Sequence, residues 1–472
     1  MSTHVAKAVM LVLLSFLFVH CSQNDNDLIP FRDGNRWGFS DIDKNIVVPT
    51  NYVRVEKFKN GLAKVYLKNK VGMINYEGEE VVPVVYDEIR EFKDGYALYR
   101  KGKEHGFIDE EGEIIPLTKY EYVGEFSEGM AAVNKNSRCG FINTDMEEVI
   151  EPRYRGVGDF SNGRAIVYSS SDDNRKSGYI DKAGNEIVPM KYDYALPYNE
   201  DMALVKINEK GYGYLDINGK EIIPCVLGGA CMFKNGYAEI SIQMYGDWYS
   251  CIINKRGKAV IPPKYKGIQE FSEGMVAVRA DRLWGFVNEE GKEVISPQYY
   301  EVGPFKCGLA RVISRIGYSY THGFIDKTGR EVIPCTFNGG GNDASEGYVF
   351  VNDGIKTYMI DNLGNKRAEF DYHRIYPFEH GYTKVEYNSK YGLIDKNGKT
   401  VIEPIYDKLQ ITESNVLIVQ YDRLWGCIDL SGKKIIPIKY DELTEYKDGL
   451  AYVKLNGKWG YVHKNGNEYF VN

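Results

Sequence analysis

Acidic residues recur at one fixed position along this 472-residue chain and are the first candidates for acid–base chemistry. Each stands three residues before a glycine, as in Asp109 with Gly112 and Asp395 with Gly398. A catalytic pair of carboxylates is expected once in a chain, whereas these acids return in almost every copy of a repeat. Asp or Asn followed by glycine at the fourth position is typical of a type I turn, in which the side chain accepts backbone N–H groups. We therefore predict turn residues here and no catalytic residues.

Other residue types that perform chemistry show no recognised arrangement. The seven histidines are scattered, and His105 and His322 stand where other copies of the repeat carry tryptophan, which favours a structural role. The chain contains no nucleophile elbow, P-loop, Cys-x-x-Cys pair or Asp-x-Asp-x-Asp calcium loop. The sequence therefore predicts a protein that is not an enzyme, with no metal site and no cofactor.

Aromatic residues and glycines are the candidate ligand contacts. Trp248, Tyr249, Tyr318 and Tyr320 lie in two unusually long segments between strands. Aromatic rings stack on sugars and also anchor protein interfaces, so both partner classes stay open. Gly229 and Gly340 belong to glycine-rich segments, which form either tight loops or a recess where backbone amides meet a ligand.

A repeat of about 35 residues organises the whole chain after its leader. Its copies are aligned by one position, which is usually glycine and recurs at intervals of 34 to 38 residues: Gly38, Gly72, Gly106, Gly140, Gly178, Gly213, Cys251, Gly285, Gly323, Tyr358, Gly392, Gly426 and Gly460. Thirteen such copies are each too small to bury their own apolar face, so neighbouring copies must pack together.

Each copy predicts three strands and a short fourth. In the second copy, residues 62–66 and 71–74 alternate in the manner of strands, and residues 80–82 form a third strand that we expect to stop at Pro83. Gly72 lies in the middle of a strand, where we expect an aromatic ring of a neighbouring copy to lie across it. No room remains for helices of ordinary length, so the predicted fold class is all-β.

The pattern Trp-Gly-aromatic-Ile-Asp-x-x-Gly-x-Glu-Val-Ile-x-Pro-x-Tyr resembles the WG-repeat family of bacterial proteins. The resemblance covers residues 31–472, although tryptophan itself is present only at Trp37, Trp284, Trp425 and Trp459. It implies a repeat class seen in cell-envelope and secreted proteins, with no catalytic residues that could be carried over.

Two architectures fit this unit. A propeller-like packing is favoured, and because thirteen units in one ring are implausible it requires two rings of six or seven units. The alternative is an open β-solenoid or superhelix. The unusual copy at Trp248 is the expected junction, which divides the repeats into residues 31–247 and 248–472.

The first 30 residues differ from the repeats. Residues 1–20 have the apolar core of a signal peptide, and residues 21–30 are a polar tether. Cys21 at their junction resembles the acylated cysteine of a bacterial lipoprotein, and an ordinary cleaved signal is the alternative. Seven cysteines remain after Cys21, an odd number that cannot all pair, so we predict buried free thiols.

Charge and composition limit the partners. The net charge of −7 is spread over interleaved acids and bases, which excludes the basic face of a nucleic-acid binder. We expect a non-enzymatic lipoprotein, anchored by lipid to an outer membrane or cell surface, or else secreted, whose repeats bind a protein or a glycan. The alternatives are a glycan-active hydrolase with a site in the repeat groove and a purely structural spacer.

Overall fold

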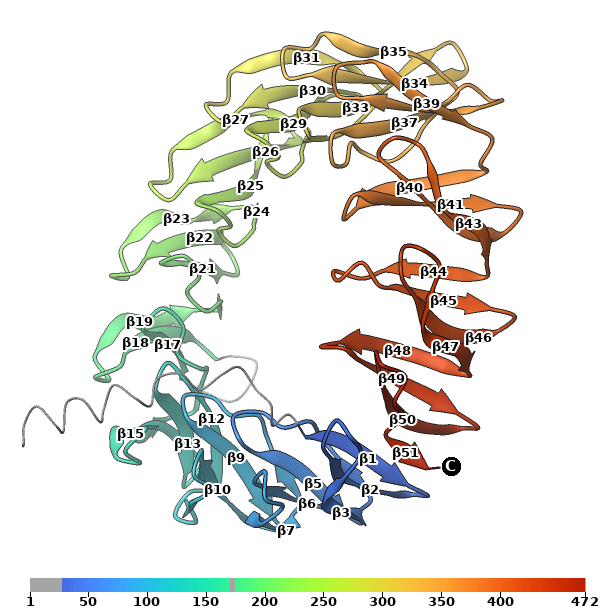
Figure 1. The fold of residues 1–472 in the computed structure, drawn as a ribbon. Coiled ribbons are helices and arrows are strands. Elements are labelled where there is room, and N and C mark those ends of the chain that lie inside the picture. The colour runs from blue at the N-terminus through green and yellow to red at the C-terminus, as the bar shows by residue number, and fades with distance from the viewer. Residues whose placement is uncertain (1–27, 170–174, 472) are drawn as a thin grey trace, which may run out of the picture.

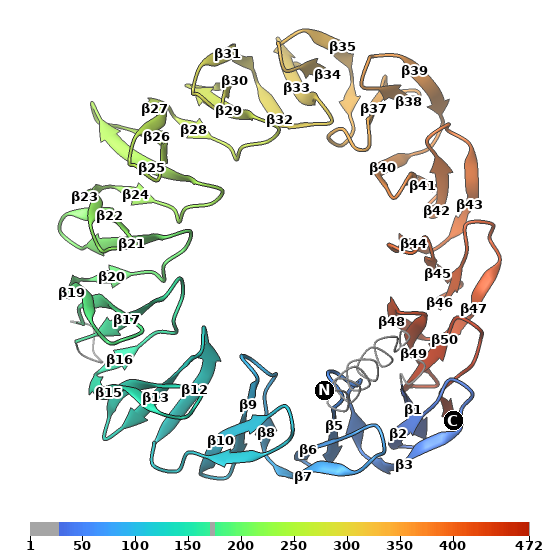
Figure 2. The ribbon, with the colours of Figure 1, turned by 60° about the vertical axis from the view of Figure 1, so that its left-hand side comes forward.

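The repeats form one closed ring of small β-sheets. The structure, a computed structural model, describes residues 28–169 and 175–471, and these contain 51 strands and no helix. The strands build thirteen antiparallel sheets that follow one another around a central opening (Figure 1, Figure 2). The predicted all-β, propeller-like array is confirmed. Both the arrangement in two rings and the open superhelix are wrong, because the two ends of the described chain pair with each other.

The sheets are numbered here from 1 to 13 in chain order. Sheets 1 to 4 contain β1 (Ile29–Asp33), β2 (Arg36–Ser40), β3 (Ile46–Tyr52); β4 (Arg54–Val55), β5 (Ala63–Leu67), β6 (Lys70–Ile74), β7 (Glu80–Tyr86); β8 (Glu88–Ile89), β9 (Tyr96–Lys101), β10 (Glu104–Asp109), β11 (Ile114–Pro116); and β12 (Tyr122–Ser127), β13 (Met130–Lys135), β14 (Arg138–Asn143), β15 (Glu148–Tyr154). Sheets 5 to 8 contain β16 (Gly156–Val157), β17 (Arg164–Tyr168), β18 (Ser177–Asp181), β19 (Glu186–Tyr192); β20 (Tyr194–Ala195), β21 (Met202–Ile207), β22 (Gly211–Asp216), β23 (Glu221–Leu227); β24 (Gly229–Ala230), β25 (Tyr237–Met244), β26 (Asp247–Asn254), β27 (Ala259–Tyr265); and β28 (Gly267–Ile268), β29 (Met275–Ala280), β30 (Leu283–Asn288), β31 (Glu293–Tyr299).

The remaining sheets follow the same order. Sheets 9 to 13 contain β32 (Glu301–Lys306), β33 (Leu309–Ile316), β34 (Ser319–Asp326), β35 (Glu331–Phe337); β36 (Gly339–Gly340), β37 (Tyr348–Asn352), β38 (Thr357–Asp361), β39 (Lys366–Phe370); β40 (Arg374–Glu379), β41 (Tyr382–Tyr387), β42 (Lys390–Asp395), β43 (Thr400–Tyr406); β44 (Lys408–Ile411), β45 (Leu417–Tyr421), β46 (Leu424–Ile428), β47 (Lys434–Tyr440); and β48 (Glu442–Lys447), β49 (Leu450–Leu455), β50 (Lys458–His463). The last strand, β51 (Phe470–Val471), joins sheet 1. In sheets 2 to 12 the strand that comes first in sequence lies nearest the opening, and the fourth lies outermost, as β44 and β47 show in Figure 2. In sheet 1 the order is β3-β2-β1-β51.

The recurring glycine allows the fourth strand to approach the third. A Cβ atom on Gly72 would lie 2.5 Å from the carbonyl oxygen of Val82 and 2.7 Å from the carbonyl carbon of Pro83. The pairing of β6 with β7 shifts its register at this point, which is a β-bulge. The expected aromatic neighbour is therefore wrong for Gly72, because the close atoms belong to the backbone of the same sheet.

The proline lies inside the outer strand and does not end it. β7 continues past Pro83 to Tyr86, which corrects the predicted end of the third segment. Proline is tolerated there because the outer strand is an edge and the bulge disturbs the ladder anyway. In sheet 10 the glycine is replaced by Tyr358, and there the register stays regular as Tyr358 pairs with Glu369.

The predicted turns are confirmed. In the turn after β10, the N–H of Gly112 donates to the carbonyl oxygen of Asp109 at 3.1 Å, and the N–H of Glu113 donates to the Asp109 carboxylate at 2.7 Å. Gly112 has a φ of 87°, which glycine adopts without strain. The same bond to an Asp or Asn side chain recurs after the third strand of sheets 1, 2 and 4 to 12, so these side chains are occupied in turns.

Aromatic pairs join many neighbouring sheets. In several copies the residue after the recurring glycine packs on the aromatic residue of the following inner turn, as Phe141 does on Phe160 at 4.8 Å between ring centroids. Tyr192 donates from its hydroxyl to Glu221 of the next sheet at 2.8 Å. Since every sheet shares its core with its neighbour, the ring behaves as one packed body.

The C-terminal segment closes the ring. The N–H of Tyr469 donates to the carbonyl of Tyr461 in β50, so the segment first extends sheet 13. Its next residues pair with β1 in parallel, and Phe470 lies opposite Arg32. In this last copy an aromatic ring does cover the glycine, because a Cβ on Gly460 would lie 2.2 Å from the Phe470 ring.

Three other expectations from the sequence concern the boundary between the two halves, the signal segment and the cysteines. The division between residues 247 and 248 lies inside β26. The signal segment and Cys21 lie outside the described residues, within which no helix has the length and apolarity needed to cross a membrane. All seven described cysteines are free, with Cys225, Cys251 and Cys427 buried.

Candidate functional site

One face of the ring carries exposed apolar side chains along about half of its circumference. Corresponding strands run in the same direction in every sheet, so the hairpins between second and third strands all open on this face. In sheets 7 to 12 these hairpins expose large apolar residues, which we call the tip arc: Tyr245, Trp248, Leu283, Ile316, Tyr318, Tyr320, Ile355, Tyr387, Tyr421 and Leu424. The described hairpins at the same place in sheets 1 to 4, 6 and 13 expose no such residue.

The tips of neighbouring sheets are in contact. The ammonium group of Lys266 lies 3.1 Å from Asp247 at the tip of sheet 7 and 3.5 Å from Asp281 at the tip of sheet 8. Tyr300, which precedes sheet 9, packs against Tyr320 at 4.8 Å between ring centroids. The tip arc is therefore a continuous feature across these three sheets, with its acids already paired.

The predicted contact residues divide between the tips and the inner strands. Tyr318 is 97% exposed, Trp248 and Tyr320 are also exposed, and Tyr249 is half-buried. Trp248 packs over the glycine-rich segment of its own sheet, since a Cβ on Gly228 would lie 2.1 Å from its ring.

The two predicted glycines lie on short inner strands, Gly229 on β24 and Gly340 on β36. Both are half-buried. Gly229 faces the side chain of Ser241, and a Cβ on Gly340 would lie 2.8 Å from His322. In sheet 7 the structure thus places the predicted Trp248 against Gly228, the neighbour of the predicted Gly229, and not against Gly229 itself.

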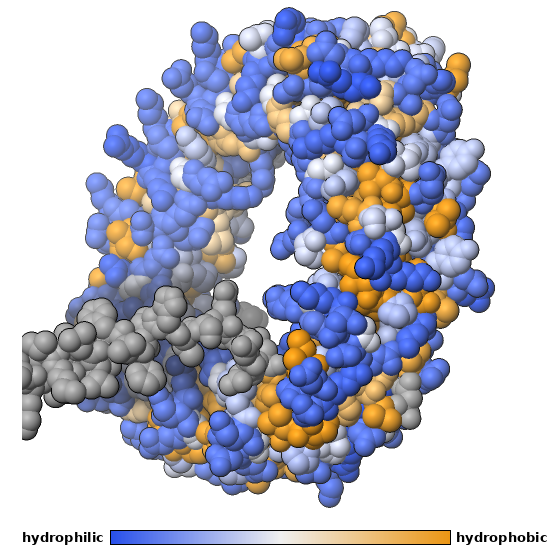
Figure 3. Space-filling view, in the orientation of Figure 1, coloured by the Kyte–Doolittle hydropathy of each residue, from blue (hydrophilic) through white to orange (hydrophobic). Residues whose placement is uncertain are grey.

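A separate groove lies between sheets 11 and 12. It has a volume of about 670 Å³ and is lined by Tyr376, Pro377, Glu379, Lys384, Tyr391, Asp407, Lys408, Leu409, Gln410, Ile411 and Trp425. Hydrophobic side chains come to the surface over the strands of these two sheets in Figure 3, which also shows that the central opening passes through the ring. We call this site the 11/12 groove.

Two lysines in the 11/12 groove are held by aromatic rings. The ammonium group of Lys384 lies 4.3 Å from the ring centroid of Tyr376 and 5.3 Å from that of Tyr391. The ammonium group of Lys408 lies 5.3 Å from the ring centroid of Trp425. Within the described residues neither lysine forms a hydrogen bond or an ion pair. Cation–π contacts fix their positions and leave their charge uncompensated.

In two corresponding grooves elsewhere, an arginine is held by ion pairs. A groove of about 540 Å³ between sheets 3 and 4 contains Arg90, which forms ion pairs with Glu88 at 3.0 Å and with Glu125 at 3.1 Å. A third groove, at the ring closure, contains Arg54, which is bound to Glu56 and to the Tyr66 hydroxyl. Lys103 and Lys458, which line these two grooves, also form no ion pair among the described residues, but neither lies over an aromatic ring. Lysines positioned by ring faces thus distinguish the 11/12 groove from these two.

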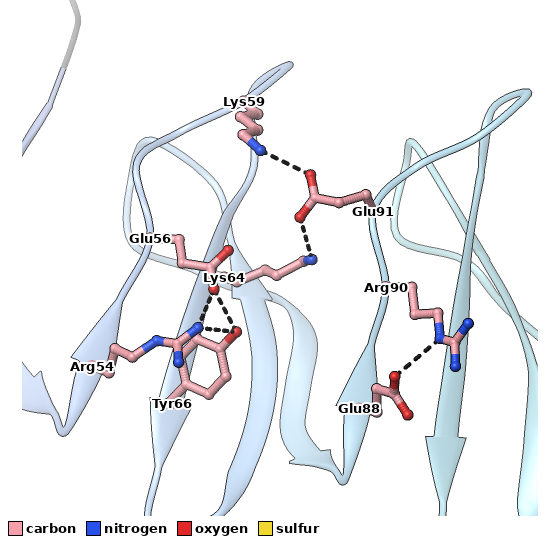
Figure 4. A network of polar contacts seen from close by, with 8 residues as sticks. All are labelled: Arg54, Glu56, Lys59, Lys64, Tyr66, Glu88, Arg90 and Glu91. Atoms are coloured by element: carbon pink, nitrogen blue, oxygen red, sulfur yellow. Dashed lines mark hydrogen bonds and ion pairs between the residues drawn. The ribbon is translucent and has the colours of Figure 1, made fainter. Parts of the chain in front are cut away.

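Ion pairs link the inner strands of sheets 2, 3 and 4. Glu91 accepts from Lys59 and from Lys64 of the preceding sheet, both at 2.8 Å, as Figure 4 shows. These bonds lower the pKa of Glu91 from 4.5 to about 2. The arrangement is a staple between sheets, and its acid is satisfied by partners within the protein.

The described residues contain no group of three or more His, Cys, Asp or Glu side chains placed to hold a metal ion. Sequence reasoning missed the lysine–aromatic groove, because its walls come from residues in two different repeats. The sequence did contain one indication of this groove. Trp425 is one of four tryptophans at the signature position, and Lys408 lies at the start of the same copy.

Comparison with known proteins gives one family and several distant structures. The family model described as "WG containing repeat" matches twelve stretches: 37–70, 72–104, 106–139, 140–168, 178–210, 212–242, 252–283, 284–313, 323–354, 359–391, 391–425 and 425–459. No curated protein sequence matches the chain.

Solved structures match at low similarity. A eukaryotic initiation factor is 14% identical with a TM-score of 0.30, covering 66% of this chain and 95% of its own. A chain assigned as the extracellular domain of a one component system from B. thetaiotaomicron is 9% identical with a TM-score of 0.20, covering 93% and 82%. The tricorn protease is 13% identical with a TM-score of 0.21, covering 84% and 46%. None of these likenesses supports an inference about activity.

Proposed function

Because this chain belongs to the family of WG containing repeats, whose unit recurs along nearly all of it, we propose that it is a non-enzymatic binding scaffold of the cell envelope. The observation that carries the proposal is the tip arc. Tyr245 is 101% exposed and Tyr318 is 97% exposed. Exposed aromatic residues concentrated on one part of a surface mark an interaction site.

The shape of the tip arc favours a protein partner. Its side chains project from separate hairpins, so they fit recesses on a partner better than they could enclose a sugar. Tyrosine, tryptophan and isoleucine supply large contact areas, and tyrosine and tryptophan are typical anchors of protein interfaces. The paired acids Asp247 and Asp281 leave little net charge at the tips of sheets 7 and 8.

Lipid anchoring would orient this face away from the membrane. β1 runs from Ile29 to its hairpin at Asp33, so the chain enters the ring on the face opposite the tips. Only six residues separate Cys21 from the first described residue, Leu28. An acylated Cys21 would therefore hold the opposite face near the bilayer. Incorporation of labelled palmitate by the chain, and its loss in Cys21→Ser, tests the anchor.

Site-specific photo-crosslinking tests the scaffold. A benzophenone amino acid is placed at Tyr318 or Tyr245, and at Lys101 in the polar hairpin of sheet 3 as the matched control. We expect an adduct with one protein from the first two positions only. The purified partner should then bind the intact chain and lose affinity for Tyr318→Ser, while Lys101→Ser binds normally. Equal labelling at all three positions would support a spacer, and an adduct with a second copy would indicate self-association; either result overturns the proposal.

A further inference from the structure

The 11/12 groove has features of a ligand site that the tip arc lacks. It is concave, its volume of about 670 Å³ falls in the range of pockets that hold drug-sized ligands, and it lies at a junction of two sheets. Three aromatic side chains, Tyr376, Tyr391 and Trp425, line it and are half-buried, so they keep accessible surface.

The charge of this groove calls for an anion. Lys384 and Lys408 are positioned by ring faces and carry no counter-ion among the described residues. Of the carboxylates that line it, Asp407 is already bound to Lys390 at 2.5 Å and accepts the N–H of Asp422 at 2.7 Å. The two lysines and the Glu379 carboxylate, which have no partner among the described residues, therefore remain to meet a ligand.

The other lining groups call for a ligand with hydroxyls and an apolar surface. Gln410 is exposed and offers both a donor and an acceptor, and the Glu379 carboxylate accepts from hydroxyl groups. Ile411, which is half-buried, supplies aliphatic contact. Aromatic rings and aliphatic groups pack on the C–H faces of sugars, while the lysines suit a carboxylate.

We propose that the 11/12 groove binds an acidic sugar residue of a polysaccharide, with Lys384 and Lys408 binding its carboxylate and the aromatic residues contacting its ring. This goes beyond the proposed docking of a protein, because it concerns a different surface and a different class of partner. Trp425 is the residue whose environment changes most directly when the groove fills.

Calorimetry with the full chain and defined oligosaccharides tests the proposal. Trigalacturonic acid is the probe, and its methyl ester, which has the same rings without the charge, is the matched ligand. We expect the acid to bind and the ester to bind at least roughly tenfold more weakly than the acid. The reason is that loss of one charged contact costs about 1.4 kcal/mol or more. Affinity for the acid should also fall as salt rises.

Variants locate the binding. The double variant Lys384→Gln, Lys408→Gln should bind trigalacturonic acid roughly tenfold or more weakly than the unaltered protein does. Lys206→Gln is the control, because Lys206 makes the same kind of contact with Tyr212 at 4.9 Å outside this groove. A midpoint of urea unfolding equal to that of the unaltered protein would show that the double variant is folded. Trp425→Phe should remove the tryptophan fluorescence change that accompanies binding.

Four outcomes overturn the proposal: no binding of the acid at millimolar concentration, equal binding of the ester, unchanged binding by the double variant, or equal binding of hexaglutamate or inorganic phosphate. The first three exclude an acidic-sugar site in this groove, and the last indicates a general anion site. None of them affects crosslinking at Tyr318, so the two proposals stand or fall separately.

Discussion

The guanidinium of Arg32 donates from Nε to the carbonyl oxygen of Trp459 at 2.5 Å, which joins the first strand of the ring to its last sheet. Arg32 is 3% exposed, and it also donates to the carbonyl oxygens of Gly34 and Val471. One buried side chain thus binds three backbone acceptors around the seam. Burial lowers the pKa of Arg32, because desolvation disfavours the charged guanidinium.

Arg32→Met should destabilise the ring, because it leaves these part-buried carbonyl groups without the donor that Arg32 supplies. Unsatisfied buried groups cost about 1–3 kcal/mol each, and we expect a loss of about 2–4 kcal/mol in the free energy of unfolding. Urea unfolding measures the loss, and hydrogen exchange should accelerate first in β1 and β50. Arg36→Met is the control, since exposed Arg36 donates only to Asn51. Equal midpoints for the two variants would show that Arg32 does not hold the seam.

Tyr469 closes the same seam from the C-terminal side. It is fully buried against Ile29 and Phe31, and its hydroxyl donates to the carbonyl oxygen of Ile42 at 2.9 Å. Tyr469→Ala should cost about 3–5 kcal/mol, as aromatic truncations in cores do. Small-angle scattering should show a larger radius of gyration as the ring opens. Val471→Ala is the exposed control, and unchanged scattering by Tyr469→Ala would contradict a seam that depends on this ring.

The bulge glycines should not tolerate a methyl group. A Cβ on Gly140 would lie 2.2 Å from the carbonyl oxygen of Ile150, a contact that only a backbone shift relieves. We expect Gly140→Ala to lower the free energy of unfolding by about 3 kcal/mol or more, in the range of overpacked cores. Gly124→Ala in the same sheet is the control, because its nearest neighbour, the Cβ of Ala132, lies at 3.5 Å. Similar losses in both variants would mean that the bulge does not explain the glycine.

The turns and the strands could be predicted from single repeats, because their causes are local. Asp109 and Gly112 form their turn through bonds within five residues. The partner of Gly72 could not be predicted, because a bulge depends on how two strands align and not on either sequence. Ring size was missed for a related reason. The angle between neighbouring sheets accumulates over thirteen copies, and the closing contact of Arg32 with Trp459 spans 427 positions.

Part of the candidate site was visible in the sequence. Trp248, Tyr318 and Tyr320 were identified because their segments are longer than those of other copies, and all three are exposed. Ile355 and Tyr421 were missed, since they lie in hairpins of ordinary length where apolar residues give no signal. The 11/12 groove required the structure, because Lys384 and Trp425 meet only when two sheets pack.

The staple at Glu91 should make stability depend on pH. Its pKa is lowered from 4.5 to about 2, so the folded protein holds the ionised form. A lowered folded-state pKa adds stability that is present above the unfolded value and is lost as pH falls from about 4.5 to about 2. Glu91 is 58% exposed, so screening reduces its contribution to about 1 kcal/mol or less.

Glu91→Gln is the variant that isolates this effect. The free energy of unfolding of the unaltered protein should exceed that of the variant at pH 7, and the two should converge near pH 2. Glu110→Gln, in the turn after β10, supplies a control acid outside the staple. Parallel pH curves for the unaltered chain and Glu91→Gln would show that the staple adds no pH-dependent stability.

Cysteine reactivity should report the packing between sheets. Burial raises the pKa of Cys427 to about 12 and that of Cys251 to about 11, and both side chains are almost fully enclosed. Cys231 is exposed, so at pH 8 it should react with a maleimide first. Cys427 and Cys251 should react only in urea, at the rate of global unfolding. Mass spectrometry of labelled peptides separates the sites, and Cys231→Ser should abolish the fast phase. Labelling of Cys427 in native buffer as quickly as Cys231 would mean that neighbouring sheets separate freely, which a closed and packed ring does not allow.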